Sequence, residues 1–166
     1  MHSSRSDIKP SSEGFIIFSK GFLMTYYIDC VYDLEDYVSE LPNVSLLRNA
    51  TADDYVIISI DSTGGVTSLI NYLACSVRAS KATIIVVYYG TFISLFPILT
   101  AADIVVEAPN AVTYCTENAI PTGVKINKKK PNTHYNGVCE VDPSYFRSTF
   151  NPISYDNYLL TYNNIL

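Results

Sequence analysis

The hydrophobic pattern of the chain alternates between short continuous apolar runs and longer stretches in which apolar residues recur every three or four positions. Runs of the first kind are typical of strands buried on both faces, and stretches of the second kind are typical of helices packed on a sheet. Segments 55–60, 83–88 and 104–107 belong to the first kind, and segments 66–78 and 92–101 belong to the second. This alternation predicts βαβ units with right-handed connections and a mainly parallel sheet.

The first third of the chain predicts two more strands and one helix. Residues 15–18 and 22–28 are rich in aromatic and β-branched side chains, which favour strands. Asp33 can cap a helix over 34–41, in which the apolar side chains share one face. Because proline lacks an amide hydrogen and clashes with the preceding turn, we expect Pro42 to interrupt this helix.

The distribution of these elements divides the chain into three parts. Residues 1–13 are polar and predict a flexible leader, whereas residues 14–120 carry the strands and helices of one α/β domain. Residues 121–166 are rich in Tyr, Asn and Pro, and no hydrophobic period persists there for long. We therefore expect an irregular C-terminal arm after a single domain core.

One uncharged run, from Ala82 to Ala102, is 21 residues long and could in principle form a membrane-spanning helix. Gly90 and Pro97 interrupt it, and residues 83–87 are mostly β-branched, which disfavours one continuous helix. We therefore interpret the run as a buried strand, a turn at Gly90 and a buried helix, and we expect no membrane partner.

The charge of the chain limits its partners further. The 166 residues carry a formal net charge of -5, whereas binding to nucleic acid needs clustered Lys and Arg. The one basic run, residues 128–130, is followed by Pro and Asn and is typical of a solvated loop. We therefore expect no nucleic-acid partner.

The cysteines and histidines form no metal-binding pattern. Cys30, Cys75, Cys115 and Cys139 lie far apart and contain no CxxC pair, so their spacing favours reduced, buried thiols over a zinc site or a disulfide framework. We expect neither a metal ion nor another cofactor. Because the other histidine lies in the leader, any histidine chemistry would depend on His134.

Two glycines follow the strand 55–60 where the helix 66–78 begins. The backbone N–H groups of Gly64 and Gly65 can be approached closely, which suits a phosphate or a developing oxyanion. The doublet is also compatible with a tight turn that only brings strand and helix together. It is neither a P-loop nor a dinucleotide-binding fingerprint, because the chain contains no Gly-Lys-Ser/Thr and no GxGxxG.

A serine occupies the corresponding corner of the next βα unit. Ser94 comes four residues after Gly90, near the start of the predicted helix 92–101. Because parallel strands bring successive corners to the same edge of a sheet, we expect Ser94 to lie near Gly65. Its hydroxyl could attack a carbonyl whose oxygen lies against the N–H groups of Gly65 and Leu95. A helix-capping or buried hydroxyl is the alternative interpretation.

Taken together, these segments resemble the proteolytic subunit of Clp protease, and in particular the short ClpP-like proteins of tailed bacteriophages. The resemblance runs from about Tyr26 to Thr116 and implies a ClpP/crotonase-like spiral of βαβ units with a mainly parallel sheet. The segments that carry it are Tyr27-Ile28-Asp29, Ile58-Ser59-Ile60-Asp61-Ser62-Thr63-Gly64-Gly65, Val77-Arg78-Ala79-Ser80, Gly90-Thr91-Phe92-Ile93-Ser94 and Ala108-Pro109-Asn110-Ala111.

The resemblance also implies roles for single residues. It makes Ser94 the nucleophile and the amides of Gly64, Gly65 and Leu95 the oxyanion donors, whereas Thr116 occupies the position of the catalytic histidine. A threonine hydroxyl cannot accept and return a proton near neutral pH, so Ser94 would lack its activating base. We therefore expect a degenerate ClpP-like subunit, a pseudo serine peptidase that acts by assembly or binding.

Two alternatives stay open at this stage. In the first, Ser94 is the nucleophile of an active serine endopeptidase of the ATP-dependent Clp type, and His134 folds back as a substitute base that Asp142 or Asp156 orients. In the second, the paired amides hold the thioester carbonyl of an acyl ligand, as in crotonase-like proteins.

The resemblance finally implies protein partners. Relatives of this kind form rings, so we expect a homo-oligomer or a heteromeric protein complex, such as a structural or regulatory component of a phage. The corresponding location is the cytoplasm of the host cell or, for a phage-encoded protein, the virion.

Overall fold

The computed structural model describes residues 18–20, 23–30, 34, 37–62, 64–116, 120, 122–129 and 137–162, so the predicted leader lies outside the described residues. The strands are β1 (Phe18–Lys20), β2 (Leu23–Cys30), β3 (Tyr55–Ser62), β4 (Thr83–Phe92), β5 (Ile104–Thr116), β6 (Ile126–Lys129), β7 (Val138–Val141) and β8 (Ile153–Ser154). The helices are α1 (Tyr37–Asn49), α2 (Thr67–Ala79), the 3-10 helix η1 (Ile93–Leu95), α3 (Phe96–Ala101), α4 (Ser144–Phe150) and α5 (Tyr155–Tyr162).

The strands form one sheet in the order β1-β2-β3-β4-β5-β7-β6, and β8 pairs with β5 outside this path. β2, β3, β4 and β5 pair in parallel, and the chain crosses between them through α1, α2 and then η1 with α3. β1 joins one end of the sheet in antiparallel direction, and β7 and β6 join the other. The predicted α/β fold with a mainly parallel sheet is confirmed.

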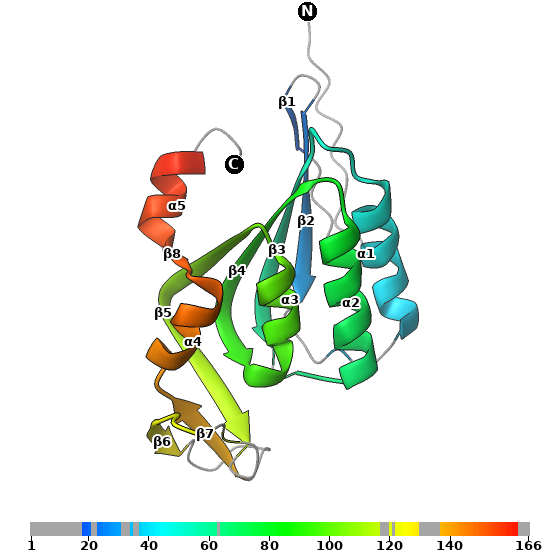
Figure 1. The fold of residues 1–166 in the computed structure, drawn as a ribbon. Coiled ribbons are helices and arrows are strands. Elements are labelled where there is room, and N and C mark those ends of the chain that lie inside the picture. The colour runs from blue at the N-terminus through cyan, green and yellow to red at the C-terminus, as the bar shows by residue number, and fades with distance from the viewer. Residues whose placement is uncertain are drawn as a thin grey trace, which may run out of the picture.

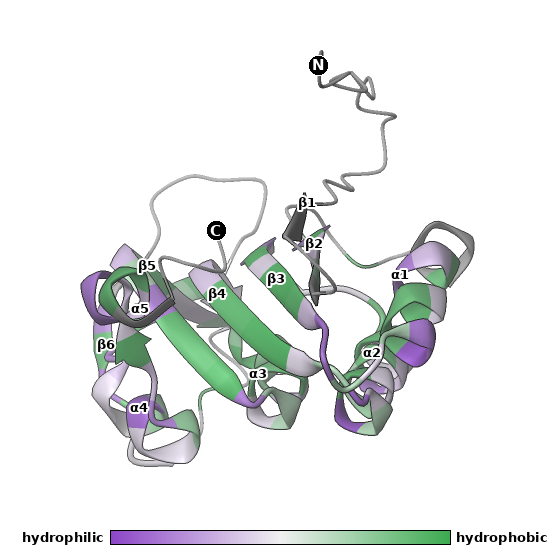
Figure 2. Ribbon diagram, turned by 90° about the horizontal axis from the view of Figure 1, so that it is seen from above, coloured by the Kyte–Doolittle hydropathy of each residue, from purple (hydrophilic) through white to green (hydrophobic). Residues whose placement is uncertain are grey.

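Helices cover the sheet unequally on its two faces. α1, α2 and α3 lie side by side over one face (Figure 1), where the larger core includes Ile58, Leu69 and Leu99. A smaller core on the other face includes Ile85, and Tyr158 of α5 packs on it. The strands between these two cores are apolar over most of their length (Figure 2), as burial on both faces requires.

Helix α1 differs from the predicted helix at both ends. It continues without a break through Pro42, where the sequence predicts an interruption before a further helical turn or two at Leu46 and Leu47. Val44 and Leu47 are 2% and 1% exposed, and their burial in the core outweighs the one backbone hydrogen bond that the proline removes. Leu34, predicted as the first helical residue, forms an isolated β-bridge instead. Asp33, the predicted cap, lies outside the described residues.

The uncharged run 82–102 folds as β4, η1 and α3, which agrees with the predicted strand and helix. Gly90, predicted as a turn, instead lies inside β4, where a Cβ would come within 2.6 Å of Asp61 Oδ1. The pairing of β4 with both neighbouring strands shifts register at this point, so the glycine makes room for the Asp61 side chain. Within the described residues, no helix is long and apolar enough to cross a membrane.

The last third of the chain contains more regular structure than its sequence predicts. β7 pairs with the end of β5, β6 pairs with β7, and Figure 1 shows these strands beyond the main part of the sheet. β8 adds to the middle of β5, and α4 and α5 stand on either side of it in the chain. These elements are only two to eight residues long, which is too short for a hydrophobic period to become visible in the sequence.

Candidate functional site

The first corner of the candidate site is a glycine turn that backbone hydrogen bonds fix from both sides. Leu34 N–H donates to the carbonyl oxygen of Gly64 at 2.9 Å, and Val66 N–H donates to the carbonyl oxygen of Leu34 at 2.8 Å. Gly64 and Gly65 have φ angles of +117° and +144°, which L side chains rarely adopt. A Cβ on Gly65 would also lie 2.2 Å from the oxygen of Leu34. Both the torsion angles and the close approach therefore require glycine.

The three predicted oxyanion donors are not equivalent. The N–H of Gly64 donates to Ser62 Oγ at 3.2 Å, so it is engaged inside the turn. For the N–H of Gly65, no acceptor is found among the residues that the structure describes. Leu95 is the third residue of η1, so the i→i−3 bonding of a 3-10 helix directs its N–H to the carbonyl oxygen of Phe92. Gly65 therefore remains as the candidate donor for a ligand.

The connection from β4 to η1 places Ser94 next to the glycine turn. A Cβ built on Gly64 would lie 2.8 Å from Ser94 Oγ, so the serine hydroxyl faces the α-carbon of this glycine across 30 residues of chain. Ser94 is exposed, and it belongs to η1 at the end of β4. Leu95, next to it, is 1% exposed and fixes η1 on the core. The structure thus brings Ser94 and the glycine turn to the same edge of the sheet.

Thr116 ends the neighbouring strand. β4 and β5 run side by side as far as Phe92 and Tyr114, whose rings lie 5.5 Å apart. Ser94 and Thr116 each lie two residues beyond this pair, and Thr116 is exposed and pairs with Val138 of β7. The part of the chain that the structure describes contains no hydrogen bond between Thr116 and Ser94.

Of the alternative catalytic group, the structure describes Asp142 and Asp156, whereas His134 lies outside the described residues. Asp142 Oδ1 accepts a hydrogen bond from the N–H of Ser144 at 2.9 Å, and this bond holds the pKa of Asp142 below its usual value. Asp142 therefore stabilises the start of α4 by accepting this hydrogen bond. Asp156 lies in the first turn of α5 and lines a separate groove.

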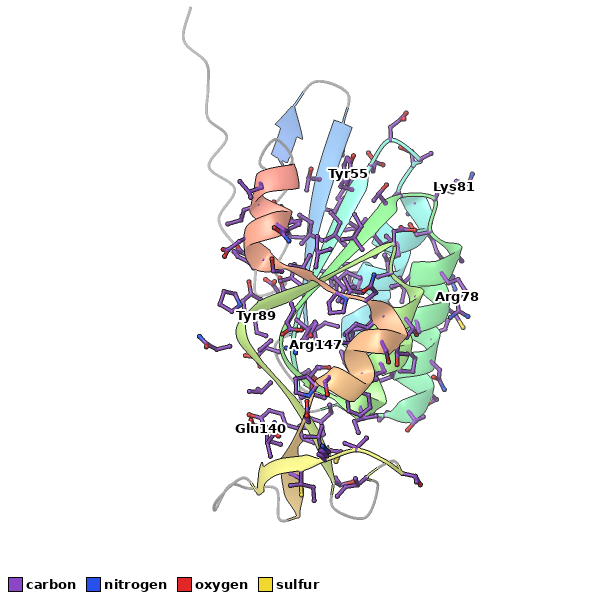
Figure 3. The ribbon with its side chains drawn as sticks, turned by 60° about the vertical axis from the view of Figure 1, so that its left-hand side comes forward. Tyr55, Arg78, Lys81, Tyr89, Glu140 and Arg147 are labelled. Carbon is purple, nitrogen blue, oxygen red and sulfur yellow. The ribbon has the colours of Figure 1, made fainter. Side chains whose placement is uncertain are left out.

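That groove, of about 500 Å³, lies where β5 bends and where β8 and α5 begin, and the sequence does not predict it. Figure 3 shows Arg147 of α4 in front of this bend, and Tyr89 at its outer side. The side chains that line the groove include those of Glu107, Asn110, Arg147, Asn151, Ser154 and Asp156.

An ion pair between Glu107 and Arg147 lines this groove, and the buried Tyr88 bonds to it from the core. The hydroxyl of Tyr88 donates to Glu107 Oε2 at 2.6 Å, and Arg147 Nε donates to the same oxygen at 2.8 Å, while Arg147 Nη2 binds Oε1. Hydrogen bonds from Arg147, and after them the one from Tyr88, lower the pKa of Glu107. Burial raises the pKa of Tyr88, and the bond to Glu107 adds to this rise. The three side chains thus hold α4 on β5.

Only part of this group has a signal in the sequence. Glu107 ends the apolar run 104–107, and a charged residue beside a buried strand indicates a nearby partner of opposite charge. Arg147, however, lies 40 residues further along the chain, beyond two strands that the sequence does not predict.

No family model matches this sequence, and no curated protein matches it either. Solved structures are similar in fold. A mutant of ClpP1 from Listeria monocytogenes is 19% identical with a TM-score of 0.44, and the match covers 58% of this chain and 57% of that one. An enoyl-CoA hydratase/isomerase from Marinobacter aquaeolei is 14% identical with a TM-score of 0.45, covering 60% and 50%.

A serine-to-alanine mutant of the membrane-bound stomatin-specific protease 1510-N is also similar, at 17% identity and a TM-score of 0.44, with 80% of this chain and 62% of that chain covered. The chain spans only 57% and 50% of the lengths of the Listeria and Marinobacter proteins. At this identity and overlap, the similarities concern the fold and not the activity.

Proposed function

We propose that this chain is a degenerate ClpP-like subunit that binds a carbonyl group of a protein partner at Ser94 and the glycine turn, without hydrolysing it. The observation that carries the proposal is the position of Ser94 Oγ beside the glycine turn. A Cβ built on Gly64 would lie only 2.8 Å from this oxygen. The resemblance of this sequence to ClpP-like proteins agrees with such a site and gives it a chemical interpretation.

Binding of a carbonyl oxygen is supported by Ser94 and the donor beside it. Ser94 is exposed, so a ligand can reach its hydroxyl. The N–H of Gly65 lies in the glycine turn beside this hydroxyl, where an unpaired amide favours an oxygen that carries negative charge. A peptide segment that approaches this edge would meet the hydroxyl of Ser94 and the amide of Gly65.

Loss of hydrolysis is supported by Thr116. This residue ends β5 beside the end of β4, at the position that the resemblance gives to a histidine. Serine is a weak nucleophile at neutral pH, and a positioned base accelerates its reactions by a factor on the order of 10² to 10⁴. A threonine hydroxyl does not supply that factor, so the site would retain binding and lose turnover.

A fluorophosphonate probe tests the loss of hydrolysis. We expect no covalent adduct on the wild-type chain under conditions that label an active serine hydrolase completely. Stoichiometric labelling that disappears in both Ser94→Ala and His134→Ala would contradict the proposal and favour an active peptidase with His134 as its base. Labelling that is lost in Ser94→Ala but kept in His134→Ala would contradict it as well, and would indicate another base.

Peptide binding is tested separately by amide chemical shifts. We expect a mixture of unstructured peptides to shift the ¹⁵N–¹H signal of Gly65, and we expect Gly64→Ala to weaken this shift because its Cβ would displace the Ser94 hydroxyl. An unchanged signal of Gly65 at millimolar peptide would argue against a binding function at this edge.

A further inference from the structure

Cys115 and Cys139, which are 24 positions apart in the sequence, lie opposite each other on two neighbouring strands. Cys115 of β5 and Cys139 of β7 are directly opposite in the antiparallel register, and both are free thiols. Residues that oppose each other in an antiparallel pair have Cα atoms about 4.5 to 5.5 Å apart. A disulfide needs a Cα separation of roughly 4.4 to 6.8 Å. The two backbones therefore already stand at a distance that a disulfide can bridge.

The buried surroundings of Cys115 and Cys139 show which elements a disulfide between them would connect. Cys115 and Cys139 are 3% and 0% exposed, and they share a small apolar cluster with Phe146 of α4. Ile93 and Phe96, which flank Ser94 in the chain, pack against the same cluster. The cluster thus connects the strands β5 and β7 with η1, the element that carries Ser94.

We propose that Cys115 and Cys139 form an intramolecular disulfide when the protein meets a small-molecule disulfide such as oxidised glutathione. One thiol loses its proton and attacks a sulfur of glutathione disulfide, which releases one glutathione thiolate and leaves a mixed disulfide on the protein. The second cysteine thiolate then attacks the protein sulfur of this mixed disulfide and releases the second glutathione thiolate. The protein loses two electrons and two protons, and both glutathione molecules leave as thiols.

Burial makes this exchange slow in the closed protein. The thiolate is the attacking species, and burial, together with the neighbouring Cys139, raises the pKa of Cys115. Oxidised glutathione reaches the pair only when β7 separates from β5, which is a local opening at one end of the sheet. The exchange therefore becomes faster at higher pH and under conditions that loosen these two strands.

The bond would brace the strands that it joins. It closes a loop of more than 20 residues, from the end of β5 through β6 to β7, and thereby lowers the entropy of the unfolded chain. For a chain of this length we expect the Tm to rise by about 6 °C on oxidation.

The experiment uses the full chain, incubated with oxidised glutathione at pH 8, quenched in acid and treated with an alkylating reagent. Before alkylation, we expect the protein without a glutathione adduct to have an intact mass lower by about 2 Da than that of the reduced protein, from the two hydrogens lost. Lys125, Lys128 and Lys129 lie between the two cysteines, so trypsin places Cys115 and Cys139 on different peptides. Under non-reducing conditions these two peptides should elute as one covalent pair that dithiothreitol separates.

The matched control is Cys75, an exposed cysteine on α2. Cys75→Ser should retain the linked peptide pair and the rise in Tm, whereas Cys115→Ala and Cys139→Ala should each lose both. If either alanine variant fails to fold, the peptide map of the wild-type protein decides alone. The proposal is wrong if Cys115 and Cys139 are both alkylated after the incubation, if the linked pair includes Cys75 or Cys30, or if the Tm does not change.

Discussion

At the scale of single residues, the turn at Gly64 and Gly65 has two neighbours of very different kinds. A Cβ on Gly64 would meet the hydroxyl oxygen of Ser94, which can rotate away. A Cβ on Gly65 would meet the backbone of Leu34, which is held by two hydrogen bonds and cannot move without breaking them. Gly64 therefore leaves room for the side chain of Ser94, and Gly65 leaves room for the backbone of Leu34.

This difference predicts unequal costs for two alanine substitutions. Gly64→Ala should lower the free energy of unfolding by about 2 kcal/mol, mainly through its positive φ, and Gly65→Ala by about 4 kcal/mol. Removing the hydroxyl in Ser94→Ala should recover about 0.5 kcal/mol of the Gly64→Ala cost and none of the Gly65→Ala cost. Urea unfolding of the wild type, the three single variants and the two double variants gives both coupling energies. Equal coupling for the two glycines would contradict the contact between Gly64 and Ser94.

The ion pair of Glu107 and Arg147 predicts a dependence of stability on pH. Because the folded protein lowers the pKa of Glu107, the pair stabilises the fold above the unfolded-state pKa, and this contribution is lost as the pH falls through the folded-state pKa. Arg147 is 47% exposed, so solvent screening limits the contribution of the pair to about 1 kcal/mol.

We expect Glu107→Gln to destabilise the protein by about 1 kcal/mol at pH 7, with a difference from the wild type that narrows between about pH 5 and pH 3. The measurement is the midpoint of urea unfolding at each pH. Asp53→Asn, in the exposed loop before β3, is the control and should stay within about 0.5 kcal/mol of the wild type at pH 7. If the difference in unfolding free energy between Glu107→Gln and the wild type increased as the pH falls, the prediction would be wrong.

At the scale of elements, α5 is the helix that packs on the second face of the sheet. Tyr158 is 1% exposed against Ile85 and Val87, whereas Leu160, two residues later, is 79% exposed. Tyr158→Ala should therefore lower the free energy of unfolding by about 3 kcal/mol, because it leaves a cavity under the helix. Leu160→Ala should change it by less than about 0.5 kcal/mol. Thermal or urea unfolding of both variants checks this, and similar effects of the two would mean that α5 does not pack as described.

The elements also differ in how far the sequence predicts them. β3, α2 and β4 follow from continuous apolar runs and a regular helical period, because each of them buries most of one or both faces. Pro42 was expected to interrupt α1, but core contacts of Val44 and Leu47 carry the helix past it. α4 and α5 are too short for a period, and they are held by contacts to β5 that no local pattern reveals.

The candidate site, too, can be predicted from the sequence only in part. That Ser94 and the glycine turn lie at one edge follows from parallel strands and from the order of the corners, so the sequence predicts it. That the N–H of Gly64 is bound by Ser62, and that Cys115 faces Cys139, depends on register. A shift of one residue between β5 and β7 would turn every side chain of β7 to the other face, and no spacing in the sequence fixes that shift.

At the scale of the whole molecule, the sheet within the described residues ends in β1 on one side and β6 on the other, and β8 likewise pairs with a single strand. Such edges present backbone groups that can pair with another chain, and Leu41 and Val66 are exposed apolar side chains outside the sheet. These exposed edges and side chains favour the expected homo-oligomer or heteromeric complex, in which another chain would cover them.

Light scattering coupled to size exclusion tests assembly directly. For the 18.4 kDa chain at micromolar concentration, we expect either a mass of two or more times this value or co-purification of a second protein from the organism that encodes the chain. Leu41→Lys and Val66→Lys, which add charge to exposed apolar positions, should lower the mass if these positions lie in the interface. A monodisperse monomer that co-purifies with no other protein would contradict the assembly proposal.

The order of the strands has a consequence for how the protein forms during its synthesis. From β1 to β5, each strand lies beside the strand that precedes it in the chain. A nascent chain that emerges from the ribosome in this order can therefore add each new strand to an edge that already exists, together with the helix that covers it. Among the described elements, β8 and α5 follow the strands that they cover, so the second face of the sheet stays open until residues 153–162 have been made. Ile85 and Val87 depend on these residues for their cover, and a chain that stops before residue 153 would leave one apolar face of the sheet exposed.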